Sequence, residues 1–277
     1  MPDDRASPDT APSAPPAQAR WADLRARVTS GAGMVVVGIG AITAGGVWFQ
    51  MLAVFVTAVM VWEVARMIRP GADVSAMLVA AFTASVLSGL LATDAGWHMG
   101  LLLAPAVLGA LIMPREKVTF FLFGLAIVTA GWGLVTFREV YGVTWLFWLV
   151  IVVVTTDVLG YFAGRIFGGP KFWPSLSPKK TWAGTAAGWI GAGIVGALFL
   201  TFTDAGRDLI WISMVLSFAS QMGDIAESAL KRRMGVKDSS ALIPGHGGLA
   251  DRFDGLLGAA LLMLLVALVV DVPEVRI

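Results

Sequence analysis

Long apolar runs alternate with short polar segments along most of the chain. A helix needs about 20 mostly apolar residues to cross the hydrocarbon core of a bilayer. Only Gly45 and Gly46 interrupt the first two runs, so nine spans are expected, with eight as the alternative. The pattern predicts an all-α, polytopic integral membrane protein. The nine expected spans are 31–46, 47–68, 74–93, 96–113, 118–137, 144–168, 182–203, 209–231 and 254–271.

The composition supports this class. The chain is 57% hydrophobic and 14% charged, with a mean hydropathy of +0.79. Soluble domains are about 45–50% apolar and about 25% charged. The absence of cysteine excludes disulfides and thiolate metal sites. The two histidines, His98 and His246, are far apart in the sequence, which argues against a histidine-rich zinc or iron site.

The charges predict the organisation and orientation of the chain. Residues 1–30, rich in Pro, Ala, Ser, Asp and Arg, are expected to be a disordered cytoplasmic tail that ends in a short basic juxtamembrane helix. Residues 31–277 are expected to form a single transmembrane domain. With the N-terminus in the cytoplasm, 17 of the 20 Lys and Arg residues lie on the cytoplasmic side. The polar connections 169–181 and 232–253 then face the cytoplasm from an inner membrane.

The segment 228–254 concentrates chemistry in an otherwise apolar chain. It holds five basic residues, three aspartates, a histidine and a Pro-Gly-His-Gly-Gly turn. Carboxylates suit a hard cation, basic side chains suit phosphate oxygens, and glycines such as Gly247 and Gly248 allow close backbone approach. The segment therefore predicts a phosphate-handling metal site at a membrane surface, and makes the transmembrane domain catalytic.

One face of span 209–231 is polar. Asp224, Glu227, Ser228 and Lys231 recur at helical spacing. A carboxylate inside a span costs at least about 2.5–3.5 kcal/mol, so each one calls for a reason. The face is either a seam between helices, with Glu227 and Lys231 as an ion pair, or a site in which Asp224 binds metal. It leads into three further candidates, Arg232, Lys237 and Asp238.

Asp251 and Asp254 share the first turn of the last span. Acids there also complement a helix N-terminus, which accounts for Asp254 by itself. Because Mg²⁺ usually takes one or two protein carboxylates, Asp224 and Asp251 are expected to hold it. Arg252 lies at the same point. His246 either orders the turn through backbone hydrogen bonds or contacts substrate.

Two other segments carry candidate residues. In span 144–168, Asp157 and Tyr161 lie on a glycine stripe that either packs closely against a neighbouring helix or lines a site. Before span 182–203, cations and hydroxyls meet a helix N-terminus and form a candidate phosphate cradle, although either lysine alone fits the positive-inside rule. These cradle residues are Ser177, Lys179, Lys180 and Thr181.

Glu63 lies at the cytoplasmic end of span 47–68, three residues before Arg66. An ion pair between these two side chains is the expected explanation for this acid.

The segment 228–254 resembles the signature of the phosphatidate cytidylyltransferase (CDP-diacylglycerol synthase) family. Segments 157–168, 177–182 and 223–228 are similar to the same family, in the same order. Ala183 departs from the pattern, where an acidic or amide residue is expected. The first five spans match only in hydropathy.

The resemblance implies transfer of a cytidylyl group from CTP to phosphatidic acid, with release of pyrophosphate. It also implies a divalent metal, a polytopic helical enzyme and a homodimer. Asp224 and Asp251 match the metal-binding aspartates of the family. With Lys231 and Lys237 as phosphate cations, these four are the expected catalytic residues, and Mg²⁺ is the expected metal, alone or with a second metal or a monovalent cation. Membrane lipid is an expected partner, and nucleic acid is not.

Three alternatives remain open at this stage. Two are related lipid enzymes, a CDP-archaeol synthase and a polyprenol or dolichol kinase-like protein. The third, from a different class, is an anion transporter that uses the same acids and cations.

Overall fold

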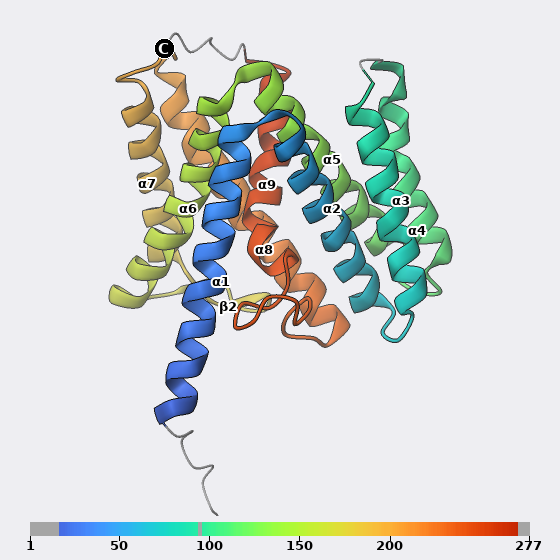
Figure 1. The fold of residues 1–277 in the computed structure, drawn as a ribbon. Helices are drawn as coiled ribbons and strands as arrows, with labels where there is room; N and C mark the ends of the chain where they lie inside the picture. Colours follow the sequence, from blue (N-terminus) through green and yellow to red (C-terminus); the bar gives the residue numbers. More distant parts are fainter. Residues whose placement is uncertain (1–16, 94–95, 271–277) are drawn as a thin grey trace, which may run out of the picture.

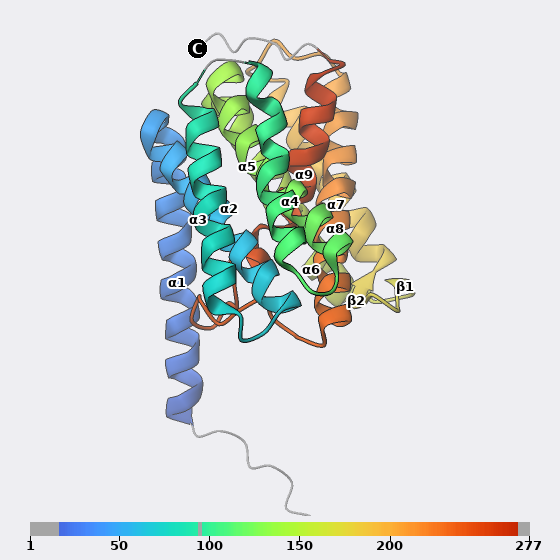
Figure 2. The ribbon, with the colours of Figure 1, turned by 90° about the vertical axis from the view of Figure 1, so that its right-hand side faces the viewer.

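The computed structural model describes residues 17–93 and 96–270, and over these ranges the chain forms nine α-helices and one two-stranded hairpin (Figures 1 and 2). Each of the nine apolar ranges overlaps mainly with one α-helix. The helices are α1 (Ala17–Ala44), α2 (Gly46–Ile68), α3 (Asp73–Leu91), α4 (Leu103–Ile112), α5 (Lys117–Tyr141), α6 (Val143–Ile166), α7 (Trp182–Phe199), α8 (Asp208–Met234) and α9 (Ala250–Ala267). A 3₁₀ segment, η1 (Gly96–Leu102), precedes α4, and β1 (Lys171–Trp173) pairs with β2 (Ser177–Thr181).

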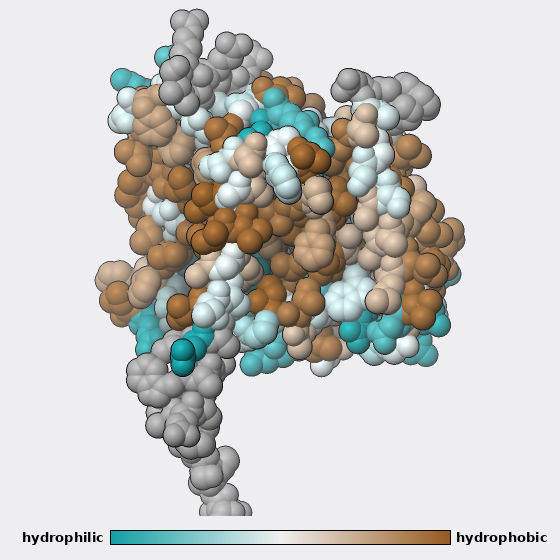
Figure 3. All heavy atoms as spheres, in the orientation of Figure 1, coloured by the Kyte–Doolittle hydropathy of each residue, from teal (hydrophilic) through white to brown (hydrophobic). Residues whose placement is uncertain are grey.

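The protein is an all-α, polytopic membrane protein, as the sequence predicts. Within the described ranges, seven helices are long and apolar enough to cross a membrane. The exceptions are α4, the main part of a shorter apolar helix, and α9, whose first turn is charged. A hydrophobic band covers the middle of the molecule, with hydrophilic side chains toward its ends (Figure 3). The number of crossings and the orientation of the N-terminus stay predictions.

The first two predicted spans are separate helices. Gly45 and Gly46 have φ of +65° and +48°, which glycine adopts without steric cost, and α1 and α2 meet there in a tight reversal. Arg138 of α5 closes this turn. Its Nε donates to the carbonyl of Ile42 at 2.8 Å, and its Nη2 donates to that of Thr43 at 3.4 Å. The first two runs therefore do not merge into one helix, and whether the chain crosses the membrane eight or nine times stays a prediction.

α1 begins at Ala17 and so includes the expected juxtamembrane helix, while residues 1–16 of the expected tail lie outside the described residues. Only 6% of the membrane-span window of α1 is buried inside the protein. The described part of the helix is covered only along one face, where Gly31, Met34, Gly38 and Ala41 are half-buried and Ile42 is buried.

α6 and α7 form the most extensive helix pair. Their contact depends on glycine: a Cβ added to Gly160 would lie 3.4 Å from the carbonyl oxygen of Gly184, and one added to Gly164 would lie 3.0 Å from Thr181 Oγ1. The packing interpretation of the stripe is confirmed for these two glycines. Gly168 follows the end of α6 with a φ of +61° and takes no part in the contact.

Two apolar clusters hold the remaining helices. One joins residues of α1, α2 and α5–α9 and includes Trp145, Leu149 and Leu216. The other joins α2 and α5 to the start of α9, and includes Phe120 and Leu249. The second cluster therefore anchors the first turn of α9 against the N-terminal half of the chain.

The two connections that the sequence singles out lie at the same end of the bundle (Figures 1 and 2). The β1–β2 hairpin, with Lys171 opposite Thr181, joins α6 to α7, and residues 235–249, here called the 235–249 loop, join α8 to α9. We call this end of the molecule the basic end. Its described basic residues are Arg25, Arg27, Arg66, Arg69, Arg115, Lys117, Arg165, Lys171, Lys179, Lys180, Lys231, Arg232, Arg233, Lys237 and Arg252.

Candidate functional site

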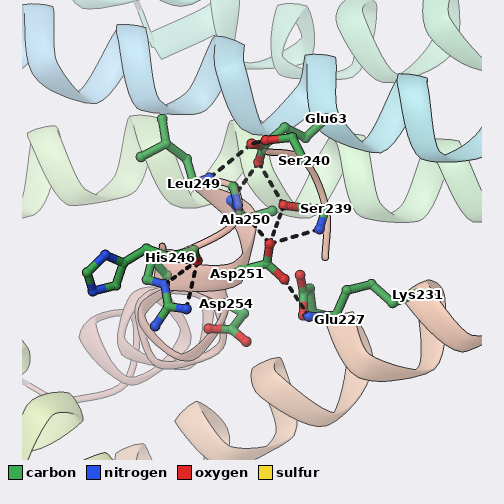
Figure 4. A network of polar contacts seen from close by, with 12 residues as sticks. Glu63, Glu227, Lys231, Ser239, Ser240, His246, Leu249, Ala250, Asp251 and Asp254 are labelled. Carbon is green, nitrogen blue, oxygen red and sulfur yellow. Dashed lines mark hydrogen bonds and ion pairs between the residues drawn. The ribbon is translucent and has the colours of Figure 1, made fainter. Parts of the chain in front are cut away.

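Asp251 lies at the centre of a polar network between α8 and α9 (Figure 4). Its Oδ1 accepts from Lys231 Nζ at 2.6 Å. Its Oδ2 accepts from Ser239 N at 2.8 Å, Ser239 Oγ at 2.8 Å and Gly248 N at 2.9 Å. A single carboxylate thus joins α8, α9 and both ends of the 235–249 loop.

Lys231 also forms an ion pair with Glu227, one turn earlier on α8. This is the i,i+4 pair that the sequence offered as one explanation of the acid, and it is confirmed. The Glu227 and Asp251 side chains are each only 6% exposed, and that of Lys231 16%. Glu227 Oε1 is buried without a hydrogen-bond partner among the described residues. The ammonium group of Lys231 therefore faces two carboxylates, and Glu227 still has an acceptor oxygen that no described donor fills.

Asp224 belongs to a second polar group, one turn earlier on the same helix. It forms an ion pair with Lys180, whose Nζ also donates to the backbone carbonyl of Gln221 at 3.3 Å. The carboxyl group of Asp254 adjoins that of Asp224, and Asp157 of α6 lies within electrostatic range of both Asp224 and Lys180. Four segments thus converge here: β2, α6, α8 and α9.

The donor set fits a cation held jointly with substrate. Within the described ranges, no three Asp, Glu, His or Cys side chains are grouped closely enough to bind a metal by themselves. Mg²⁺ usually takes one or two carboxylates and fills its other positions with water and phosphate oxygens. Adjoining carboxyls such as Asp224 and Asp254 repel unless a proton or a cation lies between them. The carboxyl group beside Asp224 is that of Asp254. Asp251, the partner expected from the sequence, belongs instead to the group around Lys231.

The expected ion pair between Glu63 and Arg66 is wrong. Arg66 Nε instead contacts Asp73 Oδ1 of α3 at 2.9 Å. The Glu63 carboxylate is fully buried and accepts hydrogen bonds from the 235–249 loop and the first turn of α9. The i,i+3 spacing was a misleading signal. The more useful signal was the cost of burying an acid at the same end of the membrane as the 235–249 loop.

His246 connects the loop to α1. Its Nδ1 lies 2.8 Å from Ser30 Oγ, which also donates to the carbonyl of Pro244 at 3.2 Å. Its own backbone carbonyl accepts from Arg252 Nε and Nη2 at 2.9 and 2.7 Å. Among the described residues, the His246 ring thus contacts a side chain of α1 and not the backbone of the turn, while its backbone carbonyl, held by Arg252, orders the turn. Contact of either with substrate stays a prediction.

The glycines of the turn are needed by the protein itself. A Cβ added to Gly247 would lie 2.8 Å from Asp251 Oδ2, and one added to Gly248 would collide with Ser239 Oγ and the Glu63 carboxylate. Both glycines therefore let the loop close around Asp251.

Some predicted site residues make contacts within their own segment of the chain. Thr181 is the N-cap of α7 and accepts from Gly184 N at 3.2 Å, and the Tyr161 hydroxyl accepts from Arg165 Nη1 at 2.9 Å. Ser177 is buried in β2 and Ser228 is half-buried on α8. The exposed candidates are Asp157, Tyr161, Lys179, Arg232, Lys237, Asp238 and Arg252.

Arg233 lies at the border of the site. Its Nη2 and Nε donate to Glu116 Oε1 at 2.8 and 3.0 Å. Hydrogen bonds from Thr119 and then from Arg233 hold the pKa of the Glu116 carboxyl below its ordinary value. Arg233 is thereby directed toward the start of α5 and away from Asp251.

The chain is also similar in sequence to known proteins. A sequence model of the cytidylyltransferase family matches residues 25–270, which is most of the chain. The chain belongs to the cytidylyltransferase family.

Three curated relatives, each named phosphatidate cytidylyltransferase, are similar over part of their length. The one from Brucella abortus is 44% identical over 140 residues, covering 50% of this chain and 52% of that protein. The one from Bacillus subtilis is 41% identical over 120 residues, covering 42% and 45%. The one from Staphylococcus haemolyticus is 40% identical over 119 residues, covering 42% and 46%. The matches thus span about half the length of these relatives.

Proposed function

We propose that this protein transfers the cytidylyl group of CTP to phosphatidic acid, forming CDP-diacylglycerol and pyrophosphate. The observation that carries the proposal is the presence of two adjoining ion pairs at the basic end, Lys180 with Asp224 and Lys231 with Asp251. Membership of the cytidylyltransferase family and the names of the relatives support the same reaction.

The reaction requires the protein mainly to position the two substrates and to supply positive charge. The phosphate of phosphatidic acid is already anionic near neutral pH, so one of its oxygens attacks the α-phosphorus of CTP without a strong base. The bond to the β-phosphate oxygen breaks, and pyrophosphate leaves. Two polyanions must be brought together, which requires positioned cations.

The side chains divide this work. Lys180 and Lys231 enter from different segments, and each already faces carboxylates that phosphate oxygens could replace as partners. Asp224 and Asp251 would hold Mg²⁺, with Asp254 beside Asp224. When bound, the ion would neutralise phosphate charge and polarise the α-phosphoryl group. The remaining predicted contacts from Asp157, Tyr161, Ser177 and the 235–249 loop would orient the two substrates.

The proposal includes a location and an assembly. The positive-inside rule supports a cytoplasmic basic end, where CTP is present and lipid enters sideways from the inner membrane. A reporter fused after Lys237 should then read cytoplasmic, and one within residues 204–208 external. The homodimer implied by the family resemblance would appear as twice the monomer mass in light scattering of the detergent-solubilised protein.

Labelled CTP tests the reaction and separates it from the alternatives. Purified protein with Mg²⁺, phosphatidic acid and α-labelled CTP should yield a lipid-soluble labelled product. A kinase-like enzyme would instead transfer label from γ-labelled CTP to a polyprenol, and a CDP-archaeol synthase would prefer an unsaturated ether-lipid phosphate. An anion transporter would give no lipid product with any label.

A further inference from the structure

Glu63 lies on α2, far in sequence from the segments that resemble the family signature. Its carboxylate is 0% exposed and accepts four hydrogen bonds. We propose that Glu63 is a positioning residue, which holds the 235–249 loop and the first turn of α9 so that Asp251 occupies its place. The proposal rests on the proposed function, since it assigns Glu63 to the same site.

Each oxygen of Glu63 binds one hydroxyl and one backbone amide. Oε1 accepts from Ser240 Oγ at 2.6 Å and Leu249 N at 2.9 Å. Oε2 accepts from Ala250 N at 2.7 Å and Ser239 Oγ at 3.2 Å. The amides of Leu249 and Ala250 begin α9, and Leu249 at the N-cap supplies no side-chain cap. Glu63 therefore caps α9 from another helix and places a negative charge at its N-terminus.

Ser239 connects this cap to the site. Its hydroxyl lies 3.2 Å from Glu63 Oε2 and 2.8 Å from Asp251 Oδ2, and its backbone amide donates to the same Asp251 oxygen (Figure 4). Gly248, which a Cβ would drive into Glu63 and Ser239, donates its amide to Asp251 as well. Glu63 and Asp251 thus hold opposite sides of one loop, and the position of either carboxylate depends on the other.

A glutamine at position 63 would have nearly the same shape but could not satisfy these contacts. Its amide offers one acceptor oxygen and one NH₂ donor. Whichever way the amide is turned, the NH₂ group faces the backbone N–H of Leu249 or of Ala250. One amide of the α9 N-terminus then loses its buried acceptor, and the loop loses part of its hold.

The kinetic test compares Glu63→Gln with Glu139→Gln. Glu139 is a matched control on α5, where it accepts from Gln50 Nε2 at 2.7 Å at the end of the bundle away from the site. The half-saturating concentrations of Mg²⁺ and CTP are measured, because they do not depend on the amount of active protein. Partners that orient metal ligands are typically worth about 10–100-fold in affinity or activity. Glu63→Gln should raise the half-saturating Mg²⁺ concentration by about tenfold or more, and Glu139→Gln should leave it unchanged.

A second measurement does not need activity. The chain has no cysteine, so Leu242→Cys, at a loop position 48% exposed, accepts a single spin label. Adding Glu63→Gln should increase the mobility of the label, and adding Glu139→Gln should not. If Glu63→Gln is recovered unfolded, Ser240→Ala takes its place, with the same changes expected at smaller size.

The outcomes separate the two proposals. Wild-type half-saturation values and wild-type label mobility in the Glu63 variant, or in its Ser240 replacement, would overturn the positioning role. So would a lower maximal rate alone, since that reports only on the amount of folded protein. If the unmutated protein forms no lipid product, the proposed function fails, and label mobility still decides whether Glu63 orders the loop.

Discussion

Asp224 and Asp251 come from neighbouring parts of the same sequence pattern, yet their surroundings differ. Asp251 accepts four hydrogen bonds and ties the 235–249 loop to α8. Asp224 has one ammonium partner, Lys180, and lies against another carboxyl group, that of Asp254. Asp251 is therefore held in place before any ligand arrives, whereas at Asp224 a bound cation would reduce the repulsion from Asp254. The two aspartates are both expected to be metal ligands, but the surrounding protein holds Asp251 more firmly than Asp224.

Replacing each aspartate by asparagine should give the largest effects and should separate the two roles. We expect Asp224→Asn and Asp251→Asn each to lower kcat by roughly 10²–10³-fold, as for the loss of a group that stabilises developing charge. Only Asp251→Asn should also lower the free energy of unfolding, by about 1–3 kcal/mol, because it weakens buried hydrogen bonds to a charged group. Turnover and thermal unfolding in detergent check both. A stable Asp251→Asn together with an unstable Asp224→Asn would reverse the comparison.

The two lysines test the same contrast from the cationic side. Lys231→Gln leaves Glu227 and Asp251 facing each other, each 6% exposed, and should destabilise the protein by about 3–5 kcal/mol. The Asp224 side chain is 34% exposed, so Lys180→Gln should cost less stability while still lowering activity. The difference between the two unfolding temperatures is the measurement. Equal losses of stability would mean that the two groups are equivalent.

Metal alone should act through the Asp224 group. Binding to the folded state stabilises it by about 2.7 kcal/mol when the ligand concentration is 100 times Kd. Added Mg²⁺, without CTP, should therefore raise the unfolding temperature of the wild type, and a chelator should remove the gain. Asp224→Asn should abolish the shift, and Glu139→Gln should keep it. A full shift in Asp224→Asn would remove Asp224 from the list of metal ligands.

The exposed lysines should show the smallest effects. Lys237 is expected from the sequence to be a phosphate cation together with Lys231, but it is exposed and lies beyond the end of α8. Substitutions at exposed positions usually change stability by no more than about 0.5 kcal/mol. Lys237→Gln and Lys179→Gln should therefore change mainly the KM for CTP, and Lys171→Gln should change neither KM nor kcat. Kinetics at limiting and saturating CTP check this order, and a silent Lys237→Gln would exclude it from phosphate binding.

The helices were predictable because the signals that define them are local. A long apolar run specifies a buried or lipid-facing helix. α1 ends directly before the glycines at 45–46, and α8 ends directly before Gly235. Gly235 adopts a φ of +69°, and its amide donates to the carbonyl of Arg232 as α8 ends. The β1–β2 hairpin was missed because its two strands are only three and five residues long and carry no clear alternation.

The site was predictable where one helix supplies the residues. The spacing of Glu227 and Lys231 implies their contact, and the structure contains it. The contact of Lys180 with Asp224 joins β2 to α8, and no spacing rule connects residues so far apart. Glu63 shows the same limit more clearly, because a nearby arginine offered a simpler partner than the loop that it actually binds.

α1 is held at two points, by Arg138 at the Gly45–Gly46 turn and by Ser30, midway along the helix, beside His246. Between these points most of its surface faces away from the protein, so acyl chains complete that wall of the molecule. Helices adjust their tilt to the thickness of the surrounding hydrocarbon. Bilayer thickness is therefore expected to influence how firmly Ser30 of α1 rests on the loop that surrounds Asp251.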